Sequence, residues 1–218
     1  GLWQFSSKGT VNGINGSVDM NFSFNEVGLK NTWVKNNGKW YYYGANGVPV
    51  KWEQWIDGSL YYFNSKGEMQ TGWITWNNDK SLSYFGGDGK ALLGLQKIGA
   101  ATYYFSPTTG RSQKWEQWIN GSLYYFNGSY KMVTGWVTWK ADGTKSYFGS
   151  DGKARGGFQK QGSSTYYMSP KTFKSVKWEQ WIDGSLYYFN GKCQMVTGWV
   201  TWKADGTKSY FGSNGKAD

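Results

Sequence analysis

The residues of this chain whose chemistry stands out are its aromatic rings. Trp, Tyr and Phe number 15, 17 and 12, five Met accompany them, and His is absent. Electron-rich rings hold organic cations by cation–π attraction, and their flat faces also stack on sugars. Acid–base catalysis needs a matched acid and base, and the sequence offers no such pair. The rings therefore predict a binding module, and we expect no enzyme activity from this chain.

The rings recur at a fixed interval. The segment WEQWI begins at residues 52, 115 and 178, a constant shift of 63 residues, and TGW follows each copy with the same shift. Such self-similarity indicates a repeat architecture. Each 63-residue repeat divides into three modules of about 21 residues, which share a short strand, a Gly-containing turn, an aromatic strand and a Gly loop.

The modules predict β-hairpins. Asp57-Gly58 separates two aromatic strands and is a strong hairpin signal, as are Asn37-Gly38, Asn120-Gly121 and Asp183-Gly184, because these turns need positive φ angles. One short hairpin cannot bury its faces alone, whereas stacked hairpins cover one another. We therefore expect an all-β fold, a β-solenoid of about nine stacked hairpins, over residues 31–218.

Charge and cysteine content narrow the partners. The net charge of +10 favours an anionic partner, although the lysines could equally serve only to keep an aromatic surface soluble. No RNA-binding signature or basic helix is evident, so no nucleic acid is expected. Cys193 is the only cysteine, which excludes an intramolecular disulfide, and no metal or cofactor site is predicted. The sequence contains no stretch of eighteen apolar residues, the length that would predict a membrane-spanning helix, so none is expected.

The order of motifs resembles a known family. TGW, a turn, YYF, Gly-x-Met and another TGW are similar to the choline-binding repeats of Gram-positive surface proteins and phage lysins, over about residues 33–218. They also resemble the glucan-binding repeats of glucansucrases and the repeats of clostridial toxins.

The resemblance implies a secreted or cell-wall-associated module, of bacterial or phage origin, that binds choline on teichoic acid in aromatic cages between hairpins. Glucan or another wall glycan is the alternative ligand, and a structural adhesin stalk is a further alternative. Phosphate-rich teichoic acid would also suit the positive charge. The sequence leaves open whether the repeats form a homodimer.

In this family a cage takes two Trp and a Met from one hairpin and an aromatic residue from the next. By that resemblance Trp33 and Trp40 supply both indoles, with Pro49 in the Met position. The WEQWI hairpins supply the Met but carry Leu60 or its equivalents in the second Trp position, where Trp55 across the hairpin could compensate. The expected ligand-binding residues are Trp33, Trp40, Trp52, Trp55, Tyr61, Met69, Trp73, Trp76, Tyr84, Trp115, Trp118, Tyr124, Met132, Trp136, Trp139, Tyr147, Trp178, Trp181, Tyr187, Met195, Trp199 and Trp202.

Residues 1–30 fit no repeat and are expected to be a separate part of the chain. Residues 1–26 resemble the end of family 25 glycoside hydrolases, the Chalaropsis-type muramidases, on the strength of Trp3-Gln4-Phe5, Gly9, Val11, Gly13, Gly16, Val18-Asp19 and Asn21. Asp19 matches an acidic residue that lines the active-site groove in that family. The catalytic carboxylates would lie upstream. The resemblance thus implies that the repeats anchor a peptidoglycan-hydrolysing lysozyme to its substrate.

Overall fold

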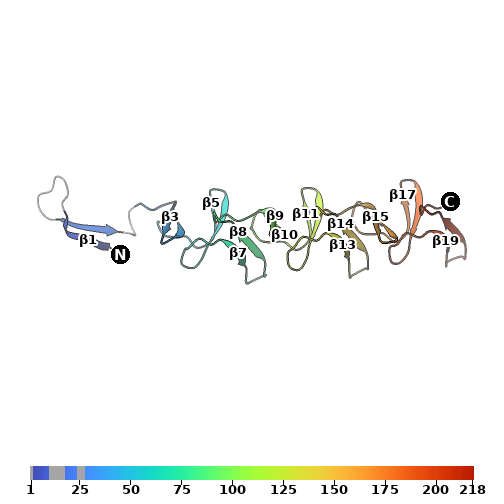
Figure 1. Cartoon of the computed structure of the whole chain (residues 1–218), viewed down its shortest axis with the longest axis horizontal. Coiled ribbons are helices and arrows are strands. Elements are labelled where there is room, and N and C mark those ends of the chain that lie inside the picture. The colour runs from blue at the N-terminus through green and yellow to red at the C-terminus, as the bar shows by residue number, and fades with distance from the viewer. Residues whose placement is uncertain (1, 10–17, 24–27) are drawn as a thin grey trace. The chain divides into compact units, whose positions relative to one another are not determined.

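A computed structural model describes residues 2–9, 18–23 and 28–218, and every regular element in them is a β-strand (Figure 1). The strands pair in sequence order into two-stranded antiparallel sheets, β1 with β2 and nine further hairpins from β3 to β20. The predicted all-β architecture and hairpin count are confirmed. The part of the chain that the structure describes contains no helix that could cross a membrane.

The chain divides into two units. The first unit comprises Gly1–Gly94 and Phe105–Ser112, and the second comprises Leu95–Tyr104 and Gln113–Asp218. The strands before the division are β1 (Leu2–Gly9), β2 (Val18–Ser23), β3 (Thr32–Asn36), β4 (Lys39–Tyr43), β5 (Trp52–Ile56), β6 (Ser59–Phe63), β7 (Gly72–Thr75) and β8 (Leu82–Phe85). Residues of β9 (Gly94–Ile98) and β10 (Ala101–Phe105) belong to both units. The remaining strands are β11 (Trp115–Ile119), β12 (Ser122–Phe126), β13 (Gly135–Thr138), β14 (Lys145–Phe148), β15 (Gly157–Gln161), β16 (Ser164–Met168), β17 (Trp178–Ile182), β18 (Ser185–Phe189), β19 (Gly198–Thr201) and β20 (Lys208–Phe211).

The two-residue turns set the register of the hairpins. Asp57 and Gly58 adopt φ angles of 47° and 73°, as the sequence predicts for a turn with two left-handed residues. The turn pairs Ile56 with Ser59 and Trp55 with Leu60, so the expected cross-strand pairing of Trp55 is confirmed. Asn37-Gly38, Asn120-Gly121 and Asp183-Gly184 repeat this conformation.

Successive hairpins stack on one large side chain each. The last residue of the second strand is fully buried in most hairpins, namely Phe63, Phe85, Phe105, Phe126, Phe148, Met168, Phe189 and Phe211. Within the first unit, Phe85 lies under Tyr62 of the preceding hairpin, with 6.1 Å between ring centroids. Within the second unit, Phe148 lies under Tyr125 at 6.0 Å. Burial of these rings gives the hairpins the core that none of them has alone.

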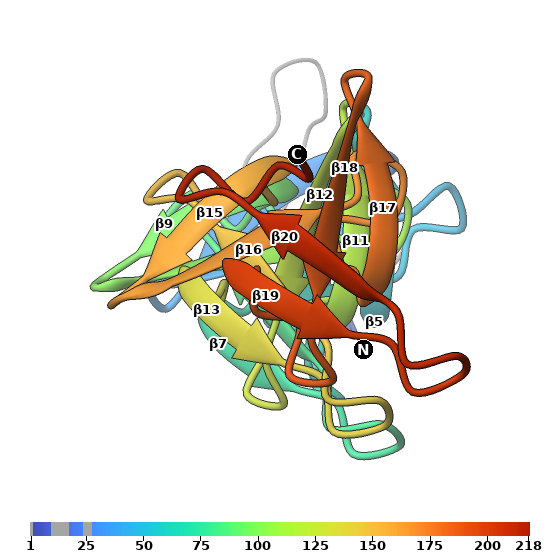
Figure 2. The ribbon, with the colours of Figure 1, turned by 90° about the vertical axis from the view of Figure 1, so that its right-hand side faces the viewer.

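One backbone hydrogen bond also joins each stacked pair. The residue that bridges back to the buried ring donates its N–H to the preceding hairpin, as Met69 does to the Trp40 carbonyl at 2.8 Å. In the second unit Ala154 donates to Leu123 in the same way, also at 2.8 Å. Figure 2 shows that β11–β12 and β17–β18 of this unit, three hairpins apart, project in the same direction. The 63-residue repeat is therefore one full set of three hairpin orientations.

A strained residue opens each WEQWI hairpin. Trp52, Trp115 and Trp178 have φ angles of 65°, 66° and 66°, in the left-handed region that non-glycine residues seldom occupy. At the same register position, opposite the buried residue, β7 and β13 have Gly72 and Gly135. These three tryptophans thus hold an exposed indole where a glycine would be unstrained.

The first strand pair differs from the repeats. β1 and β2 pair antiparallel with two register shifts, and Asp19 falls in β2. The side chains of residues 1–27 lie outside the described part of the structure, so the expected role of Asp19 is not tested.

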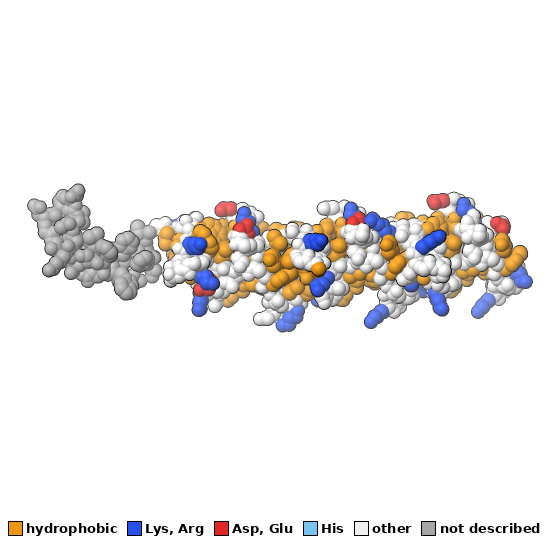
Figure 3. Space-filling model, in the orientation of Figure 1, with side chains coloured by type: hydrophobic (Ala, Val, Ile, Leu, Met, Phe, Trp, Pro, Cys, Tyr) orange, Lys and Arg blue, Asp and Glu red, His pale blue; other side chains and the backbone are white. Residues whose placement is uncertain are grey.

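On the face shown in Figure 3, exposed hydrophobic side chains lie between Lys and Arg side chains in both units.

Candidate aromatic cation site

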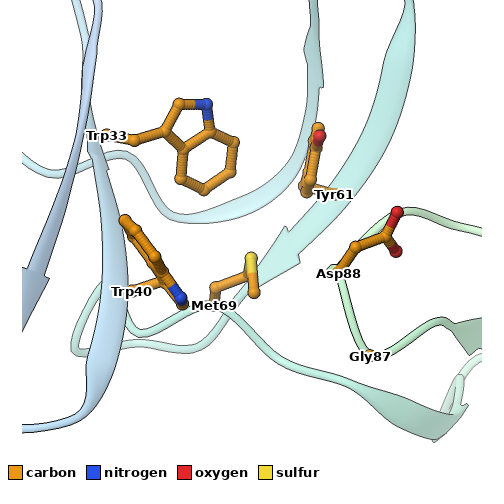
Figure 4. Close-up of a pocket in the computed structure, with 6 residues that line it drawn as sticks. All are labelled: Trp33, Trp40, Tyr61, Met69, Gly87 and Asp88. Carbon is orange, nitrogen blue, oxygen red and sulfur yellow. The ribbon is translucent and has the colours of Figure 1, made fainter.

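A pocket of about 410 Å³ opens between hairpins of the first unit (Figure 4). Three successive hairpins build it: β3–β4 contributes two indoles, β5–β6 and its following loop contribute a phenol and a thioether, and the loop after β8 closes one side. The lining residues are Trp33, Trp40, Tyr61, Met69, Gly87 and Asp88.

The rings meet at steep angles around the pocket. Trp33 and Trp40 are 6.5 Å apart between centroids, with their planes at 85°. Trp33 and Tyr61 are 4.8 Å apart, with their planes at 61°. Trp33 also lies against Phe63 at 5.9 Å, which fixes it in the core, whereas Trp40 is 40% exposed. Walls at such angles surround a small ligand on several sides, as a stacked pair could not.

Backbone and glycine geometry fix the methionine. Met69 bridges Phe63 and donates its N–H to the Trp40 carbonyl, which places the thioether beside the indoles of the preceding hairpin. Gly89, at φ 80°, passes so close that a Cβ there would collide with the Met69 sulfur. The same collision is set up between Gly152 and Met132. The thioether is therefore held between a backbone loop and the ring wall.

A carboxylate gives the pocket its charge. Asp88 lines the pocket from the exposed loop after β8. Burial raises the pKa of the Tyr61 phenol, and the negative charges of Asp88 and Asp57 raise it further. Tyr61 therefore stays neutral in this wall. Three electron-rich rings, a thioether and a carboxylate together suit a cation that carries apolar groups.

The structure brings together four of the predicted ligand-binding residues, Trp33, Trp40, Tyr61 and Met69. The sequence placed Met69 in the site of the WEQWI hairpin instead of in that of Trp33 and Trp40. The methionine comes from the loop after the second hairpin rather than from that of the indoles, so Pro49 in the earlier position does not weaken the pocket. Gly87 and Asp88 also line the pocket but were not predicted from the sequence. A signal was present, since the loops after β8, β14 and β20 carry Asp88, Asp151 and Asn214 at one repeated position.

The pocket lies at a junction, the contact between two successive hairpins, here β3–β4 and β5–β6. The copies of this junction one and two repeats later lack the indoles. In the second unit, Leu95 and Thr102 take the places of Trp33 and Trp40, beside Tyr124 and Met132. One repeat further on, Phe158 and Thr165 take them, beside Tyr187 and Met195. Phe158 and Tyr187 keep a ring contact, with 5.1 Å between centroids. Of these three junctions, only the first holds two indoles.

The tryptophans of the WEQWI strands do not join the described pocket. The pairing of β5 and β6 is regular, without the bulge that would bring Trp52 and Trp55 to one side. Both indoles are about half exposed, and neither lines the pocket. Their copies Trp115, Trp118, Trp178 and Trp181 are exposed in the same way.

The remaining predicted residues form contacts within and between hairpins. Trp73 pairs with Tyr84 and Trp136 with Tyr147, at 5.0 and 5.1 Å between centroids. Trp199 is exposed beside Tyr210. In each repeat a further indole donates its N–H to a serine hydroxyl at 2.9 Å, through the pairs Trp76–Ser83, Trp139–Ser146 and Trp202–Ser209.

Comparison with family models finds two repeat families. Residues 50–93 and 176–217 match the choline-binding repeat. Residues 31–48 and 134–154 match the putative cell wall binding repeat. Together these segments include every residue that lines the pocket.

Three solved structures from Streptococcus pneumoniae are similar to this chain. Choline binding protein F is 20% identical, with a TM-score of 0.70 over 96% of this chain and 78% of that one. The choline-binding domain of CbpL is 26% identical, with a TM-score of 0.61 over 85% of this chain and 96% of that one. The modular autolysin LytC, in complex with a synthetic peptidoglycan ligand, is 25% identical, with a TM-score of 0.50 over 87% of this chain and 48% of that one.

Among curated proteins, glucosyltransferase-S of Streptococcus mutans is 30% identical over 183 residues. The match covers 83% of this chain but only 11% of that protein. The chain is therefore similar to only a small part of that protein's length.

Proposed function

We propose, from the match of residues 50–93 and 176–217 to the choline-binding repeat, that this chain is a non-catalytic module that holds a cell-wall hydrolase on Gram-positive walls. Its ligand is choline on teichoic acid, bound in the pocket of Trp33, Trp40, Tyr61, Met69 and Asp88. The module acts outside the cell, at the wall.

The pocket is the observation that carries the proposal. Choline presents a quaternary ammonium whose charge is spread over methyl groups, so it gains from ring faces and from apolar contact at once. Each ring contributes about 0.5 kcal/mol to the binding of such a cation at an exposed site and about 2 kcal/mol at a desolvated one. Two or three rings then support a millimolar Kd, which corresponds to about −4.1 kcal/mol. Asp88 adds attraction for the ammonium, while the net charge of +10 suits the phosphates of teichoic acid.

The hydrolase is proposed from the first residues. Trp3-Gln4-Phe5 and Val18-Asp19 fall in β1 and β2, and the sequence around them resembles the end of family 25 muramidases. In this proposal the parent protein cleaves peptidoglycan, its catalytic carboxylates lie outside this chain, and its origin is bacterial or phage. The autolysin LytC, of similar repeat fold, offers a precedent for coupling such repeats to wall hydrolysis.

Calorimetric titration with choline at moderate salt tests the ligand. We expect saturable millimolar binding to the whole chain, displaced by other quaternary ammonium ions, and weakened in Trp40→Ala. The matched control is Thr102→Ala, because Thr102 holds the place of Trp40 in the next copy of the junction. Absence of heat with choline, together with retention on purified walls, would contradict the choline assignment and point to a wall glycan.

A further inference from the structure

Other hairpin junctions keep an aromatic site but fill it with a cation of the chain itself. In the second unit, Trp136 pairs across its hairpin with Tyr147 as Trp33 does with Tyr42, and Tyr166 holds the register position of Tyr61. Trp136 and Tyr166 are 5.1 Å apart at 55°, close to the 4.8 Å and 61° of Trp33 and Tyr61. The two walls of the first pocket are thus rebuilt here.

Lys145 replaces the second indole of this junction. It pairs with Thr138 as Trp40 pairs with Lys35, and its carbonyl accepts the N–H of Ser175 as that of Trp40 accepts the N–H of Met69. Its Nζ lies 4.9 Å from the centroid of the Tyr166 ring and 5.9 Å from that of Trp136. Nζ also donates to Gln161 Oε1 at 2.8 Å. Both rings therefore face an ammonium already in place.

At a different junction of the first unit, Arg111 is the cation of the chain that lies against an aromatic ring. Glu53 and Leu60 take the places of Trp33 and Trp40 there, and Ala91 donates to Leu60 in place of Met69. The Arg111 guanidinium lies 4.1 Å over the Trp76 ring and pairs with Glu53 at 3.1 Å. An aromatic face and a carboxylate thus surround the cation, as Trp33 and Asp88 flank the open pocket.

The second unit repeats the contact between cation and ring in this arrangement. Lys174 follows Arg111 by 63 residues, and its Nζ lies 4.7 Å from the centroid of the Trp139 ring. The open pocket differs from these three sites. Lys35 lies 5.6 Å from the centroid of the Trp40 ring but is not among the residues that line that pocket.

We propose that Lys145, Arg111 and Lys174 act as internal ligands, which occupy aromatic sites between hairpins and exclude external quaternary ammonium ions from them. In this proposal, these three residues determine which hairpin junctions bind choline. The proposal rests on the proposed function only for the identity of the external ligand, because the internal contacts are present without it.

Titration of Lys145 variants with tetramethylammonium tests the exclusion. Lys145→Ala removes the ammonium and is expected to bind one more ligand per chain than the wild type, with weak affinity. Lys145→Trp also restores the missing indole and should bind that additional ligand more tightly. Lys208→Trp is the matched control, because Lys208 has the same place in β20 but no described ring of a following hairpin faces it.

The outcomes separate the two proposals. An additional site in both Lys145 variants and not in the control supports the exclusion. An additional site in Lys145→Trp alone would overturn it, since the missing indole, and not the ammonium, would then be what keeps ligand out. Wild-type counts in both would also overturn it. Failure of the wild type to bind, with a site gained in Lys145→Ala, would count against the proposed function and not against the exclusion.

The melting temperature of Arg111→Ala tests the exclusion independently of the titrations. Its melting temperature should fall below that of the wild type and recover with millimolar methylguanidinium, which replaces the lost group. Arg155→Ala is the control, because Arg155 pairs with Asp151 in an exposed ion pair with no ring beneath it in the described structure. Equal responses of the two variants to methylguanidinium would contradict an aromatic cation site at Arg111.

Discussion

Trp33 and Tyr61 belong to different hairpins, yet their rings lie 4.8 Å apart and share one pocket wall. Trp33 also contacts Phe63, the buried ring of the second hairpin. The same indole therefore stacks the hairpins and lines the pocket. In the proposed function, ligand binding and hairpin stacking are coupled at this junction, because a ligand that holds Trp33 also holds the interface.

The coupling predicts that choline stabilises the fold. A ligand that binds only the folded state adds about 2.7 kcal/mol at one hundred times its Kd. We expect the melting temperature of the wild type to rise with choline concentration, and that of Trp40→Ala to rise less at each concentration. Parallel increases in the two proteins would mean that the stabilisation is not due to this pocket.

The carboxylate of Asp88 should add a salt-sensitive part of the affinity. An exposed ion pair contributes about 0.2 to 1 kcal/mol, so Asp88→Asn should weaken choline binding by about 1.4- to 5-fold. The loss should shrink as salt is raised, because the charge is exposed. Titration at low and high salt measures this. Asp151→Asn is the positional control, and an equal loss there would contradict a local role for Asp88.

A second cage should be obtainable in the second unit. Leu95→Trp with Thr102→Trp places two indoles beside Tyr124 and Met132, in the arrangement of the first pocket. We expect one more choline site per chain, weaker than the first because Arg155 already pairs with Asp151 at 2.8 Å. Calorimetric stoichiometry checks it, and an unchanged count in a folded protein would show that the rings alone do not make the site.

The left-handed tryptophans carry a measurable strain. At position 52, a side chain costs roughly 1 kcal/mol relative to glycine at positive φ. Trp52→Gly should therefore be more stable than Trp52→Ala by about that amount, since both lose the indole and only one keeps the strain. Denaturant unfolding of the two variants measures the difference. Equal stabilities would mean that the backbone relaxes when the ring is removed.

Alkaline titration should expose the environment of Tyr61. Its pKa is raised above 10.0, first by burial and then by Asp88 and Asp57. A raised pKa means that the folded state keeps the phenol neutral, so its contribution to stability is full below pH 10.0 and is lost as the pH rises through the folded pKa. The wild type should thus lose stability relative to Tyr61→Phe from about pH 9 upward (about one unit below the reference value). A constant difference between the two melting temperatures would contradict this.

Local signals in the sequence were sufficient for the hairpins. Asp57-Gly58 determines a turn, the turn determines that Trp55 faces Leu60, and these relations span only a few residues. The pocket needed more, because Met69 and Asp88 reach it from later hairpins through the stacking geometry. The internal cations were missed for the same reason. Arg111 and Glu53 are 58 residues apart, and no local pattern relates them.

The pocket also has a consequence for how such a chain can evolve in length. Trp33, Met69 and Asp88 come from three successive hairpins, so no single 21-residue module contains all the residues of this site. Loss or gain of one module would join hairpins that are not neighbours in this chain. The sites on both sides of the deletion or insertion would then change. Loss or gain of 63 residues restores every neighbour relation. The structure therefore predicts that such chains change length in steps of three hairpins, as a reading frame is kept only by insertions in multiples of three nucleotides.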